Sequence, residues 1–250
     1  MITRALTALP VYNEANHLSP VLDEVLRHCR EVLVIDDGSD DGTAKILADR
    51  GSIHVVTHER NRGYGAALKS AFDFALHNGY DVLVTIDCDG QHEPCLIPQF
   101  IAGTADADIV SGSRYLQEFP GDSRPPEERR RINQLITQRV NRQLGLCLTD
   151  AFCGFKAYRV PVLAKFSLTE MGYAMPLELW VQAVAVGLKI VEMPVPLIYL
   201  DEVRSFGGAL DHGQTRLKVY EDVLDRAIAA AGIVPQDNVC HRAIAGSKCW

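Results

Sequence analysis

Short apolar runs alternate with amphipathic segments through the first part of the chain. The apolar runs are typical of buried strands and predict strands at residues 5–11, 32–35, 53–57, 81–86 and 108–111. Between them, apolar residues recur at helical spacing. The first predicted helix runs through residues 18–29, with Ser19 as its N-cap and Pro20 in its first turn. Strands that alternate with helices form a mostly parallel sheet with helices on both faces, so we predict an α/β fold.

The second half of the chain is less regular. Its predicted elements are a loop (118–128), a helix (132–144), a second helix (175–186), an extended segment (190–200), a mobile loop (201–214) and a final helix (216–231). Pro194 and Pro196 place the extended segment at an edge of the sheet, because proline cannot donate to a ladder. We predict one domain over residues 1–233 and a tail over 234–250, which shows no clear pattern and is a candidate for disorder.

Polar motifs follow the predicted strands. In open parallel sheets, ligands collect at the carboxyl ends of the strands, so these motifs are expected to converge. The motifs are Pro10–Glu14, Asp36–Thr43, Asn61–Ala67, Asp87–His92 and Ser113–Tyr115. Their positions predict a single ligand site at one edge of the sheet.

Asp87 and Asp89 follow the central predicted strand. Residues at this spacing in extended chain point to the same side, and Gly90 allows a sharp turn after them. Two carboxylates and the amide oxygen of Gln91 suit a hard cation such as Mg²⁺ or Mn²⁺. Strand-end carboxylates are common, so this pair alone is weak evidence. His92 neighbours the pair, and we expect it to cap a helix or support a ligand rather than bind metal directly.

Two other motifs have structural and functional interpretations. Asp36 and Asp37 could form a turn and a helix cap, or recognise a ribose or base edge through a carboxylate. Gly63 and Gly65 resemble part of a dinucleotide fingerprint, but the third glycine is absent and the loop does not follow the first strand. We therefore discount a dinucleotide site.

Composition and charge narrow the class of protein. An apolar fraction of 47% over 250 residues is ordinary for a soluble globular protein, and a net charge of −7 argues against a nucleic-acid partner. Seven cysteines without a Cys-x-x-Cys motif indicate reduced thiols rather than a disulfide framework. No apolar run approaches the roughly 18 residues of a membrane span. We expect a cytoplasmic protein that is soluble or peripheral to a membrane.

Basic residues are concentrated despite the acidic balance. Three consecutive arginines occupy positions 129–131, and Arg114 lies just before the loop that precedes them. A charged helix face is often merely solvated. Arginine, however, is the preferred residue for binding phosphate oxygens, because its guanidinium group can donate two parallel hydrogen bonds to them. The cluster favours either a phosphate-bearing acceptor or an anionic membrane surface.

Together these motifs resemble a known family. The segments that carry the resemblance are Pro10–Glu14, Val34–Thr43, Asp87–His92, Ser111–Tyr115 and Cys153–Lys156. In this order they are similar to the family 2 glycosyltransferases of GT-A fold, especially the dolichyl- and polyprenyl-phosphate mannosyl- and glucosyltransferases, over roughly residues 4–231. Cys153 stands where that family usually has serine, and the chain lacks the C-terminal membrane helices of many relatives.

The resemblance implies an activity and its partners. It implies inverting transfer of a hexose, mannose or glucose, from a nucleotide-diphosphate sugar to a polyprenyl phosphate at the cytosolic membrane face. GDP-mannose and UDP-glucose are the two donors we consider, and Mg²⁺ or Mn²⁺ is the expected cofactor. Contact with the membrane is expected to be peripheral or to be made through a membrane-protein partner.

The resemblance also implies site residues. On the donor side it assigns the nucleoside pocket to Pro10, Tyr12, Glu14 and Asp37. It assigns the metal on the donor diphosphate to Asp87, Asp89 and Gln91, so Asp87 also counts among the residues that bind the donor with its cofactor. For the acceptor phosphate it assigns Arg114 and one arginine of the helix after residue 128, for which we choose Arg131. Arg204, in the predicted mobile loop, is expected to reach the donor diphosphate. The serine that follows this helix arginine in the family has only an approximate match in Thr137.

The nature of the acceptor decides which groups the chemistry needs. A lipid phosphate is already anionic and can attack without a strong base, whereas a hydroxyl acceptor needs a general base, for which Asp150 and Glu178 are the candidates. A family 2 transferase that acts on a hydroxyl in polysaccharide or glycolipid synthesis is therefore the main alternative. A non-catalytic nucleotide-sugar binder is a third possibility, and a Rossmann dehydrogenase is a distant fourth.

Overall fold

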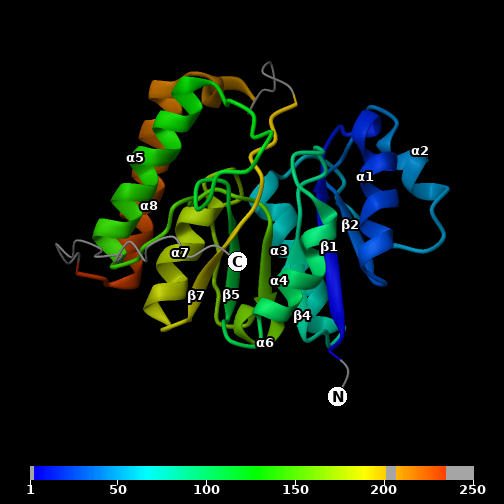
Figure 1. Ribbon diagram of the computed structural model, residues 1–250, viewed down its shortest axis with the longest axis horizontal. Coiled ribbons are helices and arrows are strands. Elements are labelled where there is room, and N and C mark those ends of the chain that lie inside the picture. The colour runs from blue at the N-terminus through cyan, green and yellow to red at the C-terminus, as the bar shows by residue number, and fades with distance from the viewer. Residues whose placement is uncertain (1–2, 201–206, 235–250) are drawn as a thin grey trace.

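The computed structural model describes residues 3–200 and 207–234. At the centre of this part lies a seven-stranded sheet in the order β3-β2-β1-β4-β6-β5-β7 (Figure 1). The strands are β1 (Ala5–Val11), β2 (Val32–Asp36), β3 (His54–Thr57), β4 (Val82–Thr85), β5 (Ile109–Ser113), β6 (Lys156–Arg159) and β7 (Ile190–Pro194). Neighbouring strands are parallel except where β6 pairs with β4 and β5. The prediction of a mostly parallel α/β sheet is confirmed.

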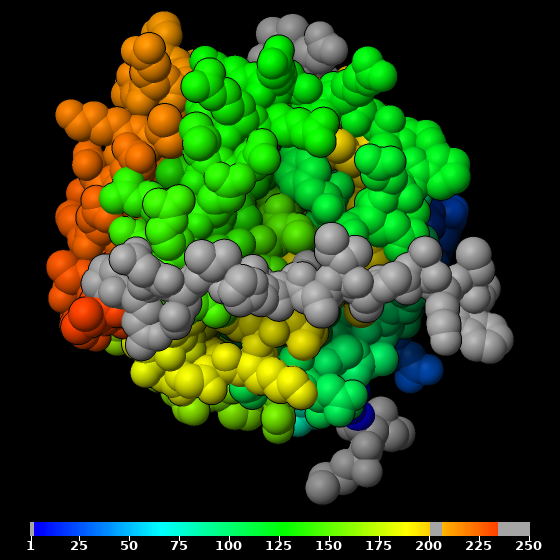
Figure 2. Space-filling model, turned by 60° about the vertical axis from the view of Figure 1, so that its left-hand side comes forward, coloured from blue at the N-terminus to red at the C-terminus, as the bar shows by residue number. Residues whose placement is uncertain are grey.

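Helices cover both faces of the sheet and enclose two hydrophobic cores (Figure 1). One face carries α1 (Ala15–His28), α2 (Thr43–Ala48) and α4 (Ile97–Gly103), and the other carries α3 (Tyr64–His77), α5 (Glu127–Leu144), α6 (Val160–Leu163), α7 (Met175–Ala185) and α8 (Gly213–Ala231). Two short 3₁₀ turns complete the described elements, η1 (Pro94–Leu96) and η2 (Gly208–Asp211). Figure 2 shows α8 beside α5 along one side of the molecule.

Strand β1 shows why the sequence predicts this sheet. Leu6 and Ala8 pack into the core beneath α3, whereas Leu9 and Val11 pack into the opposite core. Successive side chains of a strand alternate between its faces, so a strand that is covered on both faces consists of continuous apolar residues.

The first helix starts earlier than predicted. It begins at Ala15, and the carbonyl of Glu14 accepts hydrogen bonds from the amides of His17 (3.0 Å) and Leu18 (2.8 Å), so Ser19 is not its N-cap. Pro20 lies inside the helix, where its ring removes only the bond to the carbonyl of Asn16. Both residues are exposed, which leaves that carbonyl open to water.

Strand β6 and the short helix α6 were not predicted. The sequence of β6, Lys-Ala-Tyr-Arg, is short and shows no alternation of apolar and polar residues. The strand nevertheless lies between β4 and β5 and runs against both. Because it is antiparallel, its start meets the ends of the other strands, which brings the segment before Lys156 to the ligand-binding edge.

The remaining predictions have mixed outcomes. Strand β7 lies at an edge of the sheet, as expected, but it ends at Pro194, whereas the predicted extended segment continues to residue 200. Helix α8 starts three residues before the predicted Arg216. Residues 235–250 of the predicted tail and residues 201–206 of the predicted mobile loop lie outside the described residues. Free thiols are confirmed for Cys29, Cys88, Cys95 and Cys153. The prediction of reduced thiols is wrong for Cys147, which is disulfide-bonded.

Candidate active site

A cavity of about 550 Å³ opens at the carboxyl ends of the parallel strands. The predicted site residues that line it are Pro10, Tyr12, Glu14, Asp37, Asp87, Asp89, Gln91 and Arg114. The expected convergence of the strand-end motifs is therefore observed. Asp150 lies behind Arg114, Arg131 is not a lining residue, and Arg204 falls outside the described residues.

One wall of the cavity is fixed by two loops that interlock. The amide of Asn13 donates to Ser39 Oγ (2.9 Å), and the amide of Asp40 donates to Asn13 Oδ1 (2.9 Å). Asn13 has a φ of 56°, a left-handed conformation that asparagine tolerates better than most residues. These bonds hold the β1 and β2 loops together and so fix Tyr12 and Glu14 at the cavity.

Asp37 anchors the next loop from a buried position. Its Oδ1 lies 2.6 Å from His58 Nδ1 and accepts the Arg62 amide at 2.9 Å, and its Oδ2 accepts the Gly63 amide at 2.8 Å. The carboxylate thus ties the β2 end to residues 61–63 while still lining the cavity. Both interpretations of this motif, a turn and a binding group, remain compatible with its position.

The Gly63-x-Gly65 loop has a packing role. A Cβ on Gly63 would lie 2.4 Å from the Met171 carbonyl oxygen, and one on Gly65 would lie 2.6 Å from the Glu170 carbonyl oxygen. The Ala66 amide, in the first turn of α3, already donates to the Met171 carbonyl at 3.1 Å. The glycines therefore admit another segment of the chain, which agrees with our rejection of a dinucleotide site.

Asp87 is held firmly at the floor of the cavity. Its Oδ1 accepts a hydrogen bond from the Tyr64 hydroxyl (2.9 Å), and its Oδ2 lies 3.5 Å from His92 Nε2. Burial by itself raises the pKa of Asp87, but the hydrogen bond and charge of His92, the hydrogen bond from Tyr64 and the charge of Lys156 together hold the pKa below its ordinary value. A Cβ on Gly154 would lie 2.1 Å from Asp87 Oδ2, so only glycine fits there.

The donor set around Asp87 fits a hard divalent cation. Asp87, Asp89 and Gln91 all line the cavity, and the Gln91 amide donates to Asp89 Oδ1 at 3.0 Å. Carboxylate and amide oxygens are the ligands that Mg²⁺ and Mn²⁺ prefer. Among the described residues no three His, Cys, Asp or Glu side chains are grouped so as to hold an ion. An ion here would need further oxygen ligands, which water or a bound diphosphate can supply.

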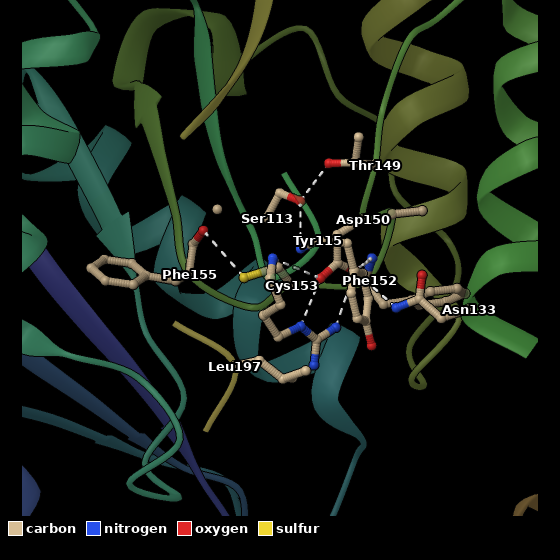
Figure 3. Close-up of polar contacts among 12 residues, drawn as sticks. Ser113, Tyr115, Asn133, Thr149, Asp150, Phe152, Cys153, Phe155 and Leu197 are labelled. Atoms are coloured by element: carbon tan, nitrogen blue, oxygen red, sulfur yellow. Dashed lines mark hydrogen bonds and ion pairs between the residues drawn. The ribbon is translucent and has the colours of Figure 1, made fainter. Parts of the chain in front are cut away.

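Arg114 and Asp150 form an ion pair at the other end of the cavity (Figure 3). Arg114 Nε donates to Asp150 Oδ2 at 2.6 Å and Nη2 donates to Oδ1 at 3.0 Å. Asp150 is fully buried, which raises its pKa, but the charge of Arg114 and its hydrogen bonds lower the pKa to about 2. The carboxylate therefore remains ionised throughout the physiological pH range.

Two further arginines line this end of the cavity. Arg129 Nη1 donates to the Tyr199 hydroxyl at 2.5 Å, and the nearly buried Arg216 donates to the Leu210 carbonyl at 2.7 Å. The predicted Arg131 is exposed and points away from the cavity-lining face of α5. Arg129, rather than Arg131, therefore lines the same cavity as Arg114.

The periodicity of α5 could have identified Arg129. The buried apolar residues Ile132 and Ile136 lie three and seven positions after it, which places all three on one helix face. Asn133, on the same face, also lines the cavity. Arg216 left no such signal, because it is one charged residue near the start of an amphipathic helix.

Neither candidate general base is available for proton transfer. Asp150 is buried and forms the ion pair with Arg114. Glu178 is buried outside the cavity lining, where it accepts hydrogen bonds from the amides of Thr169 (2.9 Å) and Glu170 (2.7 Å) and from the side chain of Gln182 (3.1 Å). Both carboxylates therefore serve the structure of their surroundings.

Comparison with known proteins identifies the family. Residues 7–166 match the family model described as glycosyl transferase family 2. The chain belongs to glycosyltransferase family 2. It is 35% identical over 205 residues to polyprenol monophosphomannose synthase of Mycolicibacterium smegmatis, covering 77% of this chain and 76% of the relative. It is 34% identical over 218 residues to undecaprenyl-phosphate mannosyltransferase of Micrococcus luteus, covering 82% of this chain and 88% of the relative.

Solved structures confirm the fold of this glycosyltransferase. Glucosyl-3-phosphoglycerate synthase of Mycobacterium tuberculosis, solved with Mn²⁺, UDP and glucosyl-3-phosphoglycerate, matches with a TM-score of 0.69 and 20% identity, over 93% of this chain and 81% of that chain. The same enzyme was also solved with Mg²⁺ and UDP. The GT-A-like fold expected from the motifs is therefore confirmed. The family match ends at residue 166, so Tyr199 and Arg216 lie beyond it.

Proposed function

We propose that this glycosyltransferase transfers a hexose from a nucleotide-diphosphate sugar to a polyprenyl phosphate with inversion at the anomeric carbon. The observation that carries the proposal is the lining of the cavity, in which carboxylates and arginines come from different parts of the fold. Glu14 and Asp37 follow β1 and β2 on one side of β4, whereas Arg114 follows β5 on the other side. Arg129 and Arg216 come from α5 and α8. Two relatives more than 30% identical to this chain are named as mannosyltransferases or mannose synthases that act on polyprenyl lipids. We therefore prefer GDP-mannose as donor and keep UDP-glucose as the alternative.

The donor is assigned to the carboxylate end of the cavity. Pro10, Tyr12, Glu14 and Asp37 would line the nucleoside pocket, whereas Asp87, Asp89 and Gln91 would hold Mg²⁺ or Mn²⁺ at the diphosphate. When bound, such an ion offsets the negative charge that develops on the leaving diphosphate. Arg204 is expected from the resemblance to reach the same group, and it stays a prediction.

The acceptor is assigned to the arginine end. The guanidinium groups of Arg114 and Arg129 would bind the acceptor phosphate and offset its repulsion from the donor diphosphate. A phosphate oxygen then forms the new bond to the anomeric carbon as the bond from that carbon to the donor phosphate breaks, and the nucleotide diphosphate leaves with the electron pair. The phosphate is anionic at neutral pH, so no proton has to be removed.

A hydroxyl acceptor is the second candidate and is less well supported. It would require a general base, and both carboxylates considered for that role, Asp150 and Glu178, are buried and hydrogen-bonded elsewhere. Transfer to phosphate needs neither of them. The structure of the arginine end therefore favours the phosphate acceptor.

The proposed acceptor is a membrane lipid, so the cavity has to meet a bilayer. No helix within residues 3–200 and 207–234 is long and apolar enough to cross a membrane. We propose peripheral contact at the cytosolic membrane face, with a membrane-protein partner as the alternative. The support is the outer side of α5, which exposes Arg130, Arg131 and Leu135 and so combines cations with an apolar side chain.

The direct test is sugar transfer to a short, water-soluble prenyl phosphate. The protein is incubated with GDP-mannose or UDP-glucose, with Mn²⁺ or with EDTA, and the product is detected by mass spectrometry. Metal-dependent product from GDP-mannose supports the full proposal. If product forms with UDP-glucose and not with GDP-mannose, the donor is UDP-glucose and the proposed GDP-mannose is wrong. Donor binding without any transfer to the phosphate would contradict the proposed acceptor.

A further inference from the structure

Asp150 accepts five hydrogen bonds in a fully buried position. Three come from Arg114, through its amide (3.4 Å), Nε (2.6 Å) and Nη2 (3.0 Å). The others come from Asn133 Nδ2 (2.9 Å) and the Phe152 amide (3.1 Å) (Figure 3). A carboxylate offers about four lone-pair sites, so this one has no acceptor capacity left for a substrate proton.

The ion pair uses one edge of the Arg114 guanidinium. Asp150 accepts hydrogen bonds from Nε and Nη2, whereas Nη1 makes no hydrogen bond to any described residue. The Arg114 side chain is 22% exposed and lines the cavity, so the guanidinium can still donate to a ligand there. Such a bidentate pair fixes both the position and the plane of the guanidinium.

The turn that carries Asp150 is itself held from three elements. On β7, Glu192 Oε1 accepts the amides of Thr149 (2.7 Å) and Asp150 (3.1 Å). From α7, Trp180 Nε1 donates to the Ala151 carbonyl (2.9 Å). From α5, Thr137 Oγ1 accepts the amide of Ala151 (3.1 Å). The turn therefore has little freedom, and neither has the carboxylate that it presents to Arg114.

We infer that Asp150 is a positioning residue, which orients the Arg114 guanidinium toward the acceptor phosphate, and that Glu192 supports it by holding the turn at residues 149–150. The inference rests on the proposed phosphate acceptor. It replaces our prediction of a general base at this position. No proton moves in this role: Asp150 acts only through Arg114, and its loss weakens acceptor binding rather than donor binding.

A double-mutant cycle separates this role from direct catalysis. Asp150→Asn, Arg114→Gln and the double variant are compared with the wild-type protein in the transfer assay. Asp150→Asn is expected to raise the KM for the prenyl phosphate by about tenfold to a hundredfold, the range for a lost hydrogen bond to a charged group. Because Asp150 acts through Arg114, the double variant is expected to lose no more activity than Arg114→Gln alone.

A second variant tests the support given by Glu192 and does not alter the ion pair itself. Glu192→Gln is expected to raise the KM for the acceptor by less than Asp150→Asn does, with an unchanged KM for the donor. The matched control is Asp108→Asn, because Asp108 Oδ2 likewise accepts a backbone amide, that of Lys189 at 2.9 Å, at the opposite end of the same strand pair. That control is expected to leave both KM values unchanged.

The outcomes distinguish the inference from the proposed function. The inference would be overturned if the activity loss of the double variant equalled the product of the two single-variant losses. A lower kcat of Asp150→Asn with an unchanged acceptor KM would overturn it as well. Either result would show direct catalysis by Asp150. An unchanged acceptor KM in both Asp150→Asn and Glu192→Gln would also overturn it. Calorimetric binding of the prenyl phosphate gives the same comparison if Asp150→Asn turns over too slowly, and thermal melting identifies a variant that fails to fold. Wild-type protein that neither binds nor glycosylates the prenyl phosphate contradicts the proposed function itself.

Discussion

Gly154 offers a direct test of how the structure positions Asp87. An alanine Cβ would lie 2.1 Å from Asp87 Oδ2 and 2.5 Å from its Cγ, far inside contact distance. The backbone cannot retreat easily, because the Gly154 carbonyl accepts a hydrogen bond from the buried Thr85 hydroxyl at 2.9 Å. In Gly154→Ala, the Asp87 carboxylate must therefore move, which weakens its bond to the Tyr64 hydroxyl.

The expected cost has two parts. Overpacking of this kind destabilises a protein by about 1–3 kcal/mol, which lowers the melting temperature of a domain of this size by about 2–4 °C per kcal/mol. Displacing a metal-binding carboxylate costs about tenfold to a hundredfold in metal affinity, by analogy with the loss of groups that orient metal ligands. We therefore expect Gly154→Ala to remain folded but to bind Mn²⁺ and the nucleotide-sugar far more weakly.

The assay is calorimetric titration of Mn²⁺ and of donor, together with a thermal melt. Gly51→Ala is the matched control, because Gly51 has open space around its Cα and no left-handed φ. It is expected to match the wild-type protein in both measurements. Gly154→Ala with wild-type affinity for donor and Mn²⁺ would refute either the observed contact or the role proposed for Asp87.

Three further predictions concern the arginine end and its surroundings. Arg129→Ala is expected to raise the KM for the prenyl phosphate by at least about tenfold, whereas Arg131→Ala, on the exposed side of α5, leaves steady-state kinetics with a soluble acceptor unchanged. Asp150 has its pKa lowered to about 2, so its contribution to stability is present above its unfolded pKa of about 3.9 and is lost as pH falls toward 2. Denaturant titrations at pH 5 and pH 2 should show that the wild-type protein loses about 2 kcal/mol more than Asp150→Asn over this interval. Burial raises the pKa of Cys153 to about 12, so maleimide at pH 8 should label the exposed Cys95 in the native protein and Cys153 only after unfolding, as read by peptide mass spectrometry.

The sheet and the carboxylates that line the cavity were predictable because local sequence determines them. Strands covered on both faces appear as continuous apolar runs, and their ends meet at one edge whatever the details of packing. Asp87 and Asp89 follow such a run directly, so their position depended on one strand and one turn. The motifs of the resemblance lie on the same strand ends.

The arginine end depends on contacts between distant segments and was less predictable. Arg129 could be found from the periodicity of α5, but Asp150 meets Arg114 only because the short strand β6 runs antiparallel between β4 and β5. Four residues without a clear pattern do not reveal that arrangement. The role of Asp150 consequently changed from a candidate base to a partner of Arg114, and Arg216 was not foreseen as a lining residue.

The most direct test of the central claim compares two acceptors that differ only in their end group. A short prenyl phosphate and the matching prenyl alcohol are offered to the wild-type protein with GDP-mannose and Mn²⁺. If the cavity binds an anionic acceptor through Arg114 and Arg129 and supplies no general base, the phosphate accepts the sugar and the alcohol does not. Glycosylation of the alcohol at a comparable rate would contradict that claim.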